Sequence, residues 1–103
     1  MRADYDSEAD ALSIDLLIVD RWDGPDDPID DSYCHVSFAG GEPANIEILS
    51  PRAHPEAIDF LDQAAERYGL DAEALRAIAK AALQAPDRIV EIKVGGKLTT
   101  AES

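Results

Sequence analysis

The spacing of the apolar residues changes near the middle of the chain, and this change limits the fold more than any other feature. In the first half they alternate, as in Leu12, Ile14 and Leu16, which is the period of a β-strand with one buried face. In the second half they recur every three or four positions, which is the period of an amphipathic helix. The pattern predicts an α+β protein with helices packed on a sheet.

Five strands are predicted, near residues 2–5, 12–19, 32–38, 44–49 and 88–94. Gly40-Gly41 predicts a hairpin turn between the third and the fourth. The order of strands, two helices and a last strand implies an antiparallel or mixed sheet, in which the first strands form a β meander. The strand at 12–19 is also apolar on its second face, at Leu17 and Val19, so this face is a candidate for covering by a helix or another subunit.

Two helices are predicted, at about 55–68 and 72–85. Pro55 suits the first turn of the former, and Asp71 is a typical N-cap for the latter. We expect a helical hairpin that covers one side of the sheet. The 103 residues then form a single domain, with an acidic β meander over 1–50 and the hairpin and final strand over 51–103.

The charge is concentrated in the first half of the chain. Residues 1–50 carry 13 acidic and 2 basic side chains, and the whole chain has a net charge of −13. Such a field repels phosphate backbones and anionic membranes, so we expect neither nucleic acid nor a membrane as a direct partner. It attracts basic proteins, although solubility alone also explains it. One cysteine and no long apolar run predict a cytoplasmic protein.

Residues 20–31 are predicted to form an acidic loop because they hold proline, glycine and six aspartates without a period. An exposed tryptophan among acids could anchor a basic partner. The candidate binding residues are Trp22, Asp23, Asp26, Asp27, Asp30 and Asp31. The loop does not match EF-hand spacing, and two histidines and one cysteine lack paired zinc spacing, so no metal site and no cofactor are predicted.

Residues 5–12, Tyr-Asp-Ser-Glu-Ala-Asp-Ala-Leu, resemble the opening of a bacterial domain-of-unknown-function family, numbered 2283. Its members typically read Tyr-Asp-x-Glu-Ala-Asp-Ala-Leu, and residues 46–49, Ile-Glu-Ile-Leu, resemble their usual close. The resemblance covers about residues 2–50. Ser13 replaces a common aromatic, Ala44 stands near the usual glycine, and the loop at 20–31 is longer and more acidic. The resemblance implies a small β meander and no established activity.

The motif carboxylates Asp6, Glu8 and Asp10 have two interpretations. Aspartate side chains bond nearby backbone amides in turns, which is a structural role. Alternatively, the three carboxylates and His35 could form a binding or acid–base cluster. No nucleophile or base stands at a spacing that completes a catalytic set, so no catalytic residue is predicted.

Our leading hypothesis is an interaction module that binds a basic protein, as a homodimer through Leu17 and Val19. One alternative is a small enzyme or ligand-binding domain with a carboxylate-lined cleft. Another is a structural domain whose acidity serves solubility.

Overall fold

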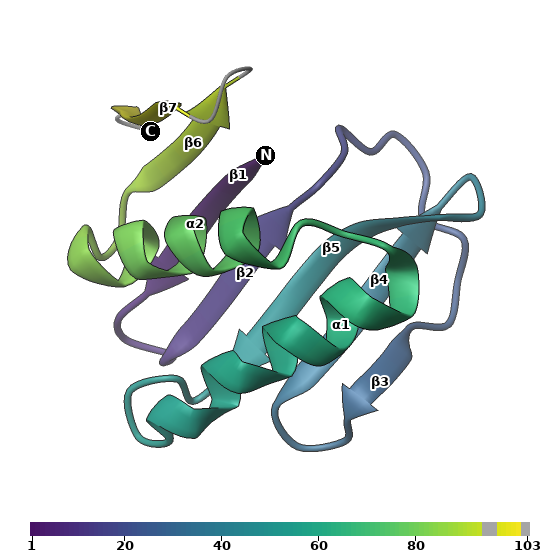
Figure 1. Ribbon diagram of the computed structural model, residues 1–103, viewed down its shortest axis with the longest axis horizontal. Helices are drawn as coiled ribbons and strands as arrows, with labels where there is room; N and C mark the ends of the chain where they lie inside the picture. Colours follow the sequence, from purple (N-terminus) through teal and green to yellow (C-terminus); the bar gives the residue numbers. More distant parts are fainter. Residues whose placement is uncertain (94–96, 102–103) are drawn as a thin grey trace.

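The computed structural model describes residues 1–93 and 97–101, which form one antiparallel sheet with two helices on one face (Figure 1). The strand order is β3-β4-β5-β2-β1-β6-β7, and every neighbouring pair is antiparallel. The strands are β1 (Arg2–Asp6), β2 (Ala11–Asp15), β3 (Asp27–Asp30), β4 (Cys34–Ala39), β5 (Glu42–Leu49), β6 (Ile89–Lys93) and β7 (Lys97–Ala101). The predicted α+β class is confirmed.

The helical hairpin begins with a 3-10 turn, η1 (Pro55–Asp59), and continues as α1 (Phe60–Tyr68) and α2 (Ala72–Gln84). Gly69 ends α1 in the left-handed conformation, with φ 66°, which glycine adopts without a steric cost. Asp71 caps α2, since its carboxylate accepts a hydrogen bond from Ala74 N at 3.1 Å. Both helices lie on the same face of the sheet (Figure 1).

The predicted strand at 12–19 is wrong in its second half, because β2 ends at Asp15. Leu16 N and Leu17 N both donate hydrogen bonds to the Ala44 carbonyl oxygen, at 2.8 and 3.4 Å. Because the two amides share one acceptor, the regular ladder of hydrogen bonds with β5 ends here. Ile18 is then 96% exposed. Leu17 and Val19 therefore do not lie on a strand face.

The edges of the sheet also differ from the prediction. The acidic loop contains β3, which pairs with β4 although Pro28 cannot donate a backbone hydrogen bond. An edge strand tolerates this loss, since one of its sides has no partner. The strand β7 was not predicted, and Val94, in the predicted strand at 88–94, lies outside the described residues.

The two faces of the sheet differ completely in chemistry. The face toward the helices is apolar, and no polar or charged residue is buried in the described part of the chain. Its buried strand residues are Ala3, Tyr5, Leu12, Ile14, Cys34, Val36, Ala44, Ile46, Ile48 and Val90. The alternating residues form what we call the open face, and they include Arg2, Asp4, Ser13, Asp15, His35, Asn45, Glu47 and Glu91.

Candidate binding site

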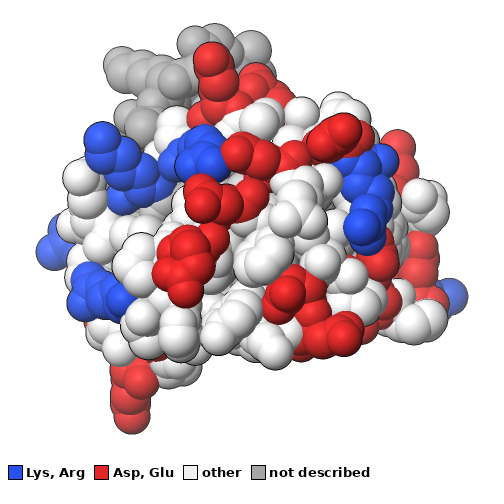
Figure 2. Space-filling model, turned by 60° about the horizontal axis from the view of Figure 1, so that its bottom comes forward, with Lys and Arg blue, Asp and Glu red and all other residues white. Residues whose placement is uncertain are grey.

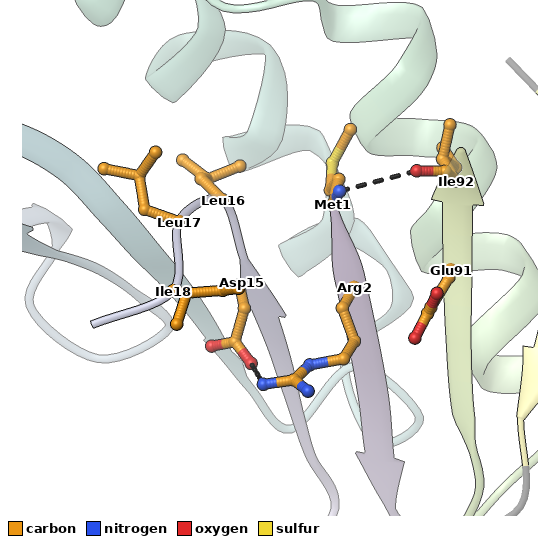
Figure 3. A pocket seen from close by; sticks show the side chains of 8 residues that line it. All are labelled: Met1, Arg2, Asp15, Leu16, Leu17, Ile18, Glu91 and Ile92. Atoms are coloured by element: carbon orange, nitrogen blue, oxygen red, sulfur yellow. Dashed lines mark hydrogen bonds and ion pairs between the residues drawn. The ribbon is translucent and has the colours of Figure 1, made fainter. Parts of the chain in front are cut away.

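Two hollows adjoin along β1, and together we call them the β1 groove. They share Arg2 and Asp15. The apolar hollow, of about 200 Å³, is also lined by Met1, Leu16, Leu17, Ile18, Glu91 and Ile92 (Figure 3). The acidic hollow, of about 470 Å³, is also lined by Asp4, Tyr5, Asp6, Asp87, Arg88 and Ile89. The groove therefore has an apolar end and an acidic end.

An ion pair stands at the junction of the two hollows. Arg2 Nη2 lies 3.3 Å from Asp15 Oδ2, and the two residues are cross-strand partners of β1 and β2 (Figure 3). The two side chains are 52% and 32% exposed, so water weakens their attraction. Exposed pairs of this kind contribute about 0–1 kcal/mol. A charged ligand could therefore replace either partner at little cost.

Asp4 stands in a negative environment within the acidic hollow. Its pKa is raised, first by desolvation and then by repulsion from Asp15 and Asp6, and Arg2 offsets this only in part. The raised pKa means that the ionised carboxylate is less stable here than in water. A cation bound at this position would relieve the repulsion.

The far end of the acidic hollow is built by the turn after β1. Asp6 Oδ1 accepts hydrogen bonds from Glu8 N and Ala9 N, both at 3.0 Å, which is an Asx-turn. Asp87 accepts two hydrogen bonds from Ser7, from its amide at 3.0 Å and its hydroxyl at 2.6 Å. These bonds hold the turn against the loop that precedes β6.

Asp10 fastens this turn to the loop that precedes the helices. Its carboxylate accepts hydrogen bonds from the Tyr5 hydroxyl at 2.7 Å, from Arg52 N at 3.0 Å and from Ala53 N at 3.1 Å. Desolvation alone would raise the pKa of Asp10, but the three hydrogen bonds outweigh it and lower the pKa. The carboxylate of Asp10 is thus directed at the protein's own groups.

His35 lies away from the motif carboxylates. The strands β5 and β2 separate β4, which carries His35, from β1, a distance of about 14 Å. The imidazole nitrogens lie 2.8 Å from Asp26 Oδ2 and 3.0 Å from the Asp31 carbonyl oxygen. The structure therefore does not bring His35 together with Asp6, Glu8 and Asp10, and the acid–base cluster is not assembled.

Four carboxylates of the acidic loop make contacts within the protein, and one of them is Asp26, which contacts His35. Asp23 accepts hydrogen bonds from the amides of Gly40 and Gly41, at 2.8 and 2.7 Å. Asp27 pairs with Arg67 at 2.8 Å and also contacts the Tyr68 hydroxyl.

Asp30 accepts hydrogen bonds from Ser32 N and Tyr33 N, both at 2.9 Å. Trp22 is 50% exposed, and Asp31 is exposed as well. Of the predicted binding residues, Trp22 and the Asp31 side chain are thus the most accessible to a partner.

Three further observations concern the cysteine, the residue types that bind metals, and the helices. Cys34 is buried in the core, and desolvation is the main cause that raises the pKa of its thiol to about 12, so it stays protonated at neutral pH. Within residues 1–93 and 97–101, no three His, Cys, Asp or Glu residues are grouped to hold a metal ion. None of the described helices has the length and apolar content needed to cross a bilayer.

The chain matches no protein-family model, and no curated protein or solved structure matches it either. Membership of the family that residues 5–12 resemble stays a prediction. The β1 groove was not predicted from the sequence. Its one local signal is the alternation of Arg2, Asp4 and Asp6, which places three charged side chains on the same face of a strand.

Proposed function

We propose that this protein is an acidic interaction module that binds a basic partner protein through the open face of its sheet. The observation that carries the proposal is the charge of this face. Five acids, Asp4, Asp6, Asp15, Glu47 and Glu91, alternate with the buried residues of β1, β2, β5 and β6, and Arg2 alone among the described side chains of these four strands is basic.

Several acids near the helices are paired with arginines, whereas acids predominate on the open face. Arg76 donates hydrogen bonds to both Asp59 and Asp62, at 3.1 and 2.8 Å, and Arg67 pairs with Asp27. On the side seen in Figure 2, acidic side chains are spread widely and basic ones stand in small groups among them. A basic partner would therefore gain most on the open face, where Asp4, Asp6, Asp15, Glu47 and Glu91 outnumber the basic side chains.

The size and lining of the groove favour a macromolecular partner over a small molecule. The apolar hollow, at about 200 Å³, lies below the usual range of small-molecule sites. The acidic hollow is large enough, but charged side chains dominate its lining, whereas small-molecule sites are mostly apolar. A protein surface with complementary charge fits both hollows.

The test is binding of a short oligolysine peptide to the full chain, measured by fluorescence anisotropy at low and high salt. We expect salt-sensitive binding that Asp4→Asn/Glu47→Gln weakens about tenfold. The matched control, Glu66→Gln/Glu73→Gln, removes the same charge from α1 and α2 and should weaken binding much less. Equal loss in both variants would mean that net charge alone matters, and it would contradict the proposal.

Self-association through Leu17 and Val19 is the alternative to this proposal, because a second copy would cover the same segment that a basic partner would contact. Leu17 is 40% exposed and Val19 is half-buried, and both lie in the segment that follows β2. Analytical ultracentrifugation of the wild type and of Leu17→Ser tests whether this segment joins two copies.

A further inference from the structure

We propose that the apolar hollow receives one large apolar side chain of the basic partner, and that the bound segment is extended, with basic residues two and four positions from this anchor. The inference rests on the proposed function and names the kind of segment that the groove selects. It follows from the shape and lining of the β1 groove rather than from its charge alone.

The apolar hollow is open and lined by side chains that the core leaves partly uncovered. Met1, Leu16 and Ile92 pack against the core from its border, and Leu17 is 40% exposed. Met1 directly precedes β1, Leu16 and Leu17 follow β2, and Ile92 lies in β6 (Figure 3). Ile18 is 96% exposed beside them. Burying one apolar side chain here would remove apolar surface on both partners from water.

The charges along the β1 groove favour a partner segment with basic side chains next to its apolar residue. The rim of the apolar hollow carries Asp15 and Glu91 as well as Arg2, and the acidic hollow continues from it along β1. The acidic hollow carries Asp4, Asp6 and Asp87 beside Arg88, so a segment that fills the apolar end passes over a lining in which acids outnumber bases. Basic side chains next to the anchor would be attracted, and acidic ones would be repelled.

The spacing of β1 gives the spacing of the partner. Arg2, Asp4 and Asp6 lie on one face at intervals of two residues, which span about 13 Å in an extended strand. An extended partner segment places its own alternate side chains at the same interval. The segment that fits best is therefore an apolar residue with a basic residue two positions after it and another four positions after it.

A second copy of this chain is a poorer occupant. Each copy carries a net charge of −13, and the groove would bring two acidic surfaces together. Like charges that face each other across an interface are unfavourable. The partner argued here has the opposite sign.

The test compares two end-capped, labelled peptides, Leu-Ser-Lys-Ser-Lys and Ala-Ser-Lys-Ser-Lys, on the full chain by fluorescence anisotropy. We expect the leucine peptide to bind about tenfold more tightly, since burying a leucine side chain is worth about that factor. Leu17→Ser should reduce this ratio to nearly one, whereas Asp4→Asn should weaken both peptides by the same factor. Trp22→Ser removes another exposed apolar side chain outside the groove and should leave the ratio unchanged.

The outcomes separate this inference from the proposed function. If both peptides and oligolysine bind equally and salt weakens all three, the interaction module stands and the apolar anchor is wrong. If oligolysine fails to bind at low salt, the proposed function itself fails. If Trp22→Ser removes the preference and Leu17→Ser does not, the anchor lies elsewhere. If the wild type is a dimer that Leu17→Ser dissociates, a second copy occupies the hollow and the inference is overturned.

Discussion

The covered and the open faces of the sheet are made by alternating residues of the same strands, and they differ in what they contribute. In β1, Ala3 and Tyr5 are buried under the helices, while Arg2, Asp4 and Asp6 point the other way and are exposed. The covered face supplies the apolar burial that stabilises the fold. The open face is not packed against the helices, so it carries charged side chains whose burial would be costly. Stability and recognition are thus separated across the thickness of one sheet.

The strongest way to test this separation is to truncate one residue on each face. Leu12→Ala on the covered face should lower the free energy of unfolding by about 2–5 kcal/mol, because it leaves a cavity among buried side chains. Glu47→Ala, on the neighbouring strand of the open face, should change it by less than about 0.5 kcal/mol. Urea denaturation followed by circular dichroism measures both. Similar losses in the two variants would contradict the separation.

A substitution of Asp10 tests whether the turn between β1 and β2 stabilises the fold. Asp10→Ala should cost about 1–3 kcal/mol, because the Tyr5 hydroxyl and two loop amides lose their acceptor. Glu8→Ala, in the same turn but exposed, is the control and should cost much less.

The same carboxylate gives a pH dependence. Since the folded pKa of Asp10 is lowered, its contribution is present above the unfolded pKa of about 4 and is lost as pH falls through the folded pKa. Thermal unfolding of wild type and Asp10→Ala should therefore converge in acid. A constant difference across the pH range would show that the charge of Asp10 contributes nothing.

His35 lies on the open face and contacts the acidic loop, so its pKa tests whether this loop is held against the sheet. Desolvation lowers its pKa, but the hydrogen bonds to Asp26 and to the Asp31 carbonyl outweigh this and raise it overall. A doubly protonated ring donates to both acceptors.

The stabilisation by His35 is complete below the unfolded pKa of about 6.5 and is lost as pH rises through the higher folded pKa. An NMR titration of the imidazole protons should give a pKa above that of a free histidine, and Asp26→Asn should bring it down. A pKa that Asp26→Asn leaves unchanged would contradict this pairing.

The smallest expected effect concerns Asp4, where stability and binding should move in opposite directions. Because its folded pKa is raised, the stabilising contribution belongs to the neutral form and is lost as pH rises through the folded pKa. Asp4→Asn should therefore raise the melting temperature at neutral pH by at most about 2 °C, since water screens this exposed group. The gain should vanish in acid, while binding of oligolysine weakens. Calorimetry and anisotropy on the same variant measure both effects.

The elements themselves were largely predictable, because their signals are local. Alternation located β1, β4, β5 and β6, and the helical spacing with Asp71 as a cap located α2. The end of β2 was not predictable, since Leu17 and Val19 continue the apolar pattern and only the shared Ala44 carbonyl ends the ladder. The strand β3 was missed because Pro28 and two aspartates argue against a strand, and its pairing with β4 overrides that preference.

The candidate site was less predictable than the fold. The sequence pointed to the acidic loop, yet Asp23, Asp27 and Asp30 make contacts within the protein. Their roles depend on partners such as Gly40 and Arg67, which no spacing along the chain reveals.

The sequence by itself determined which residues are buried and which are charged, because a period of two or of 3.6 separates the faces of a strand or a helix. Only the tertiary structure decided that β1 lies between β2 and β6 and so places Arg2 beside both Asp15 and Glu91. Strand order depends on hydrogen bonds and packing between segments far apart in the chain, such as Met1 and Ile92, which are 91 residues apart. The β1 groove exists because of that order.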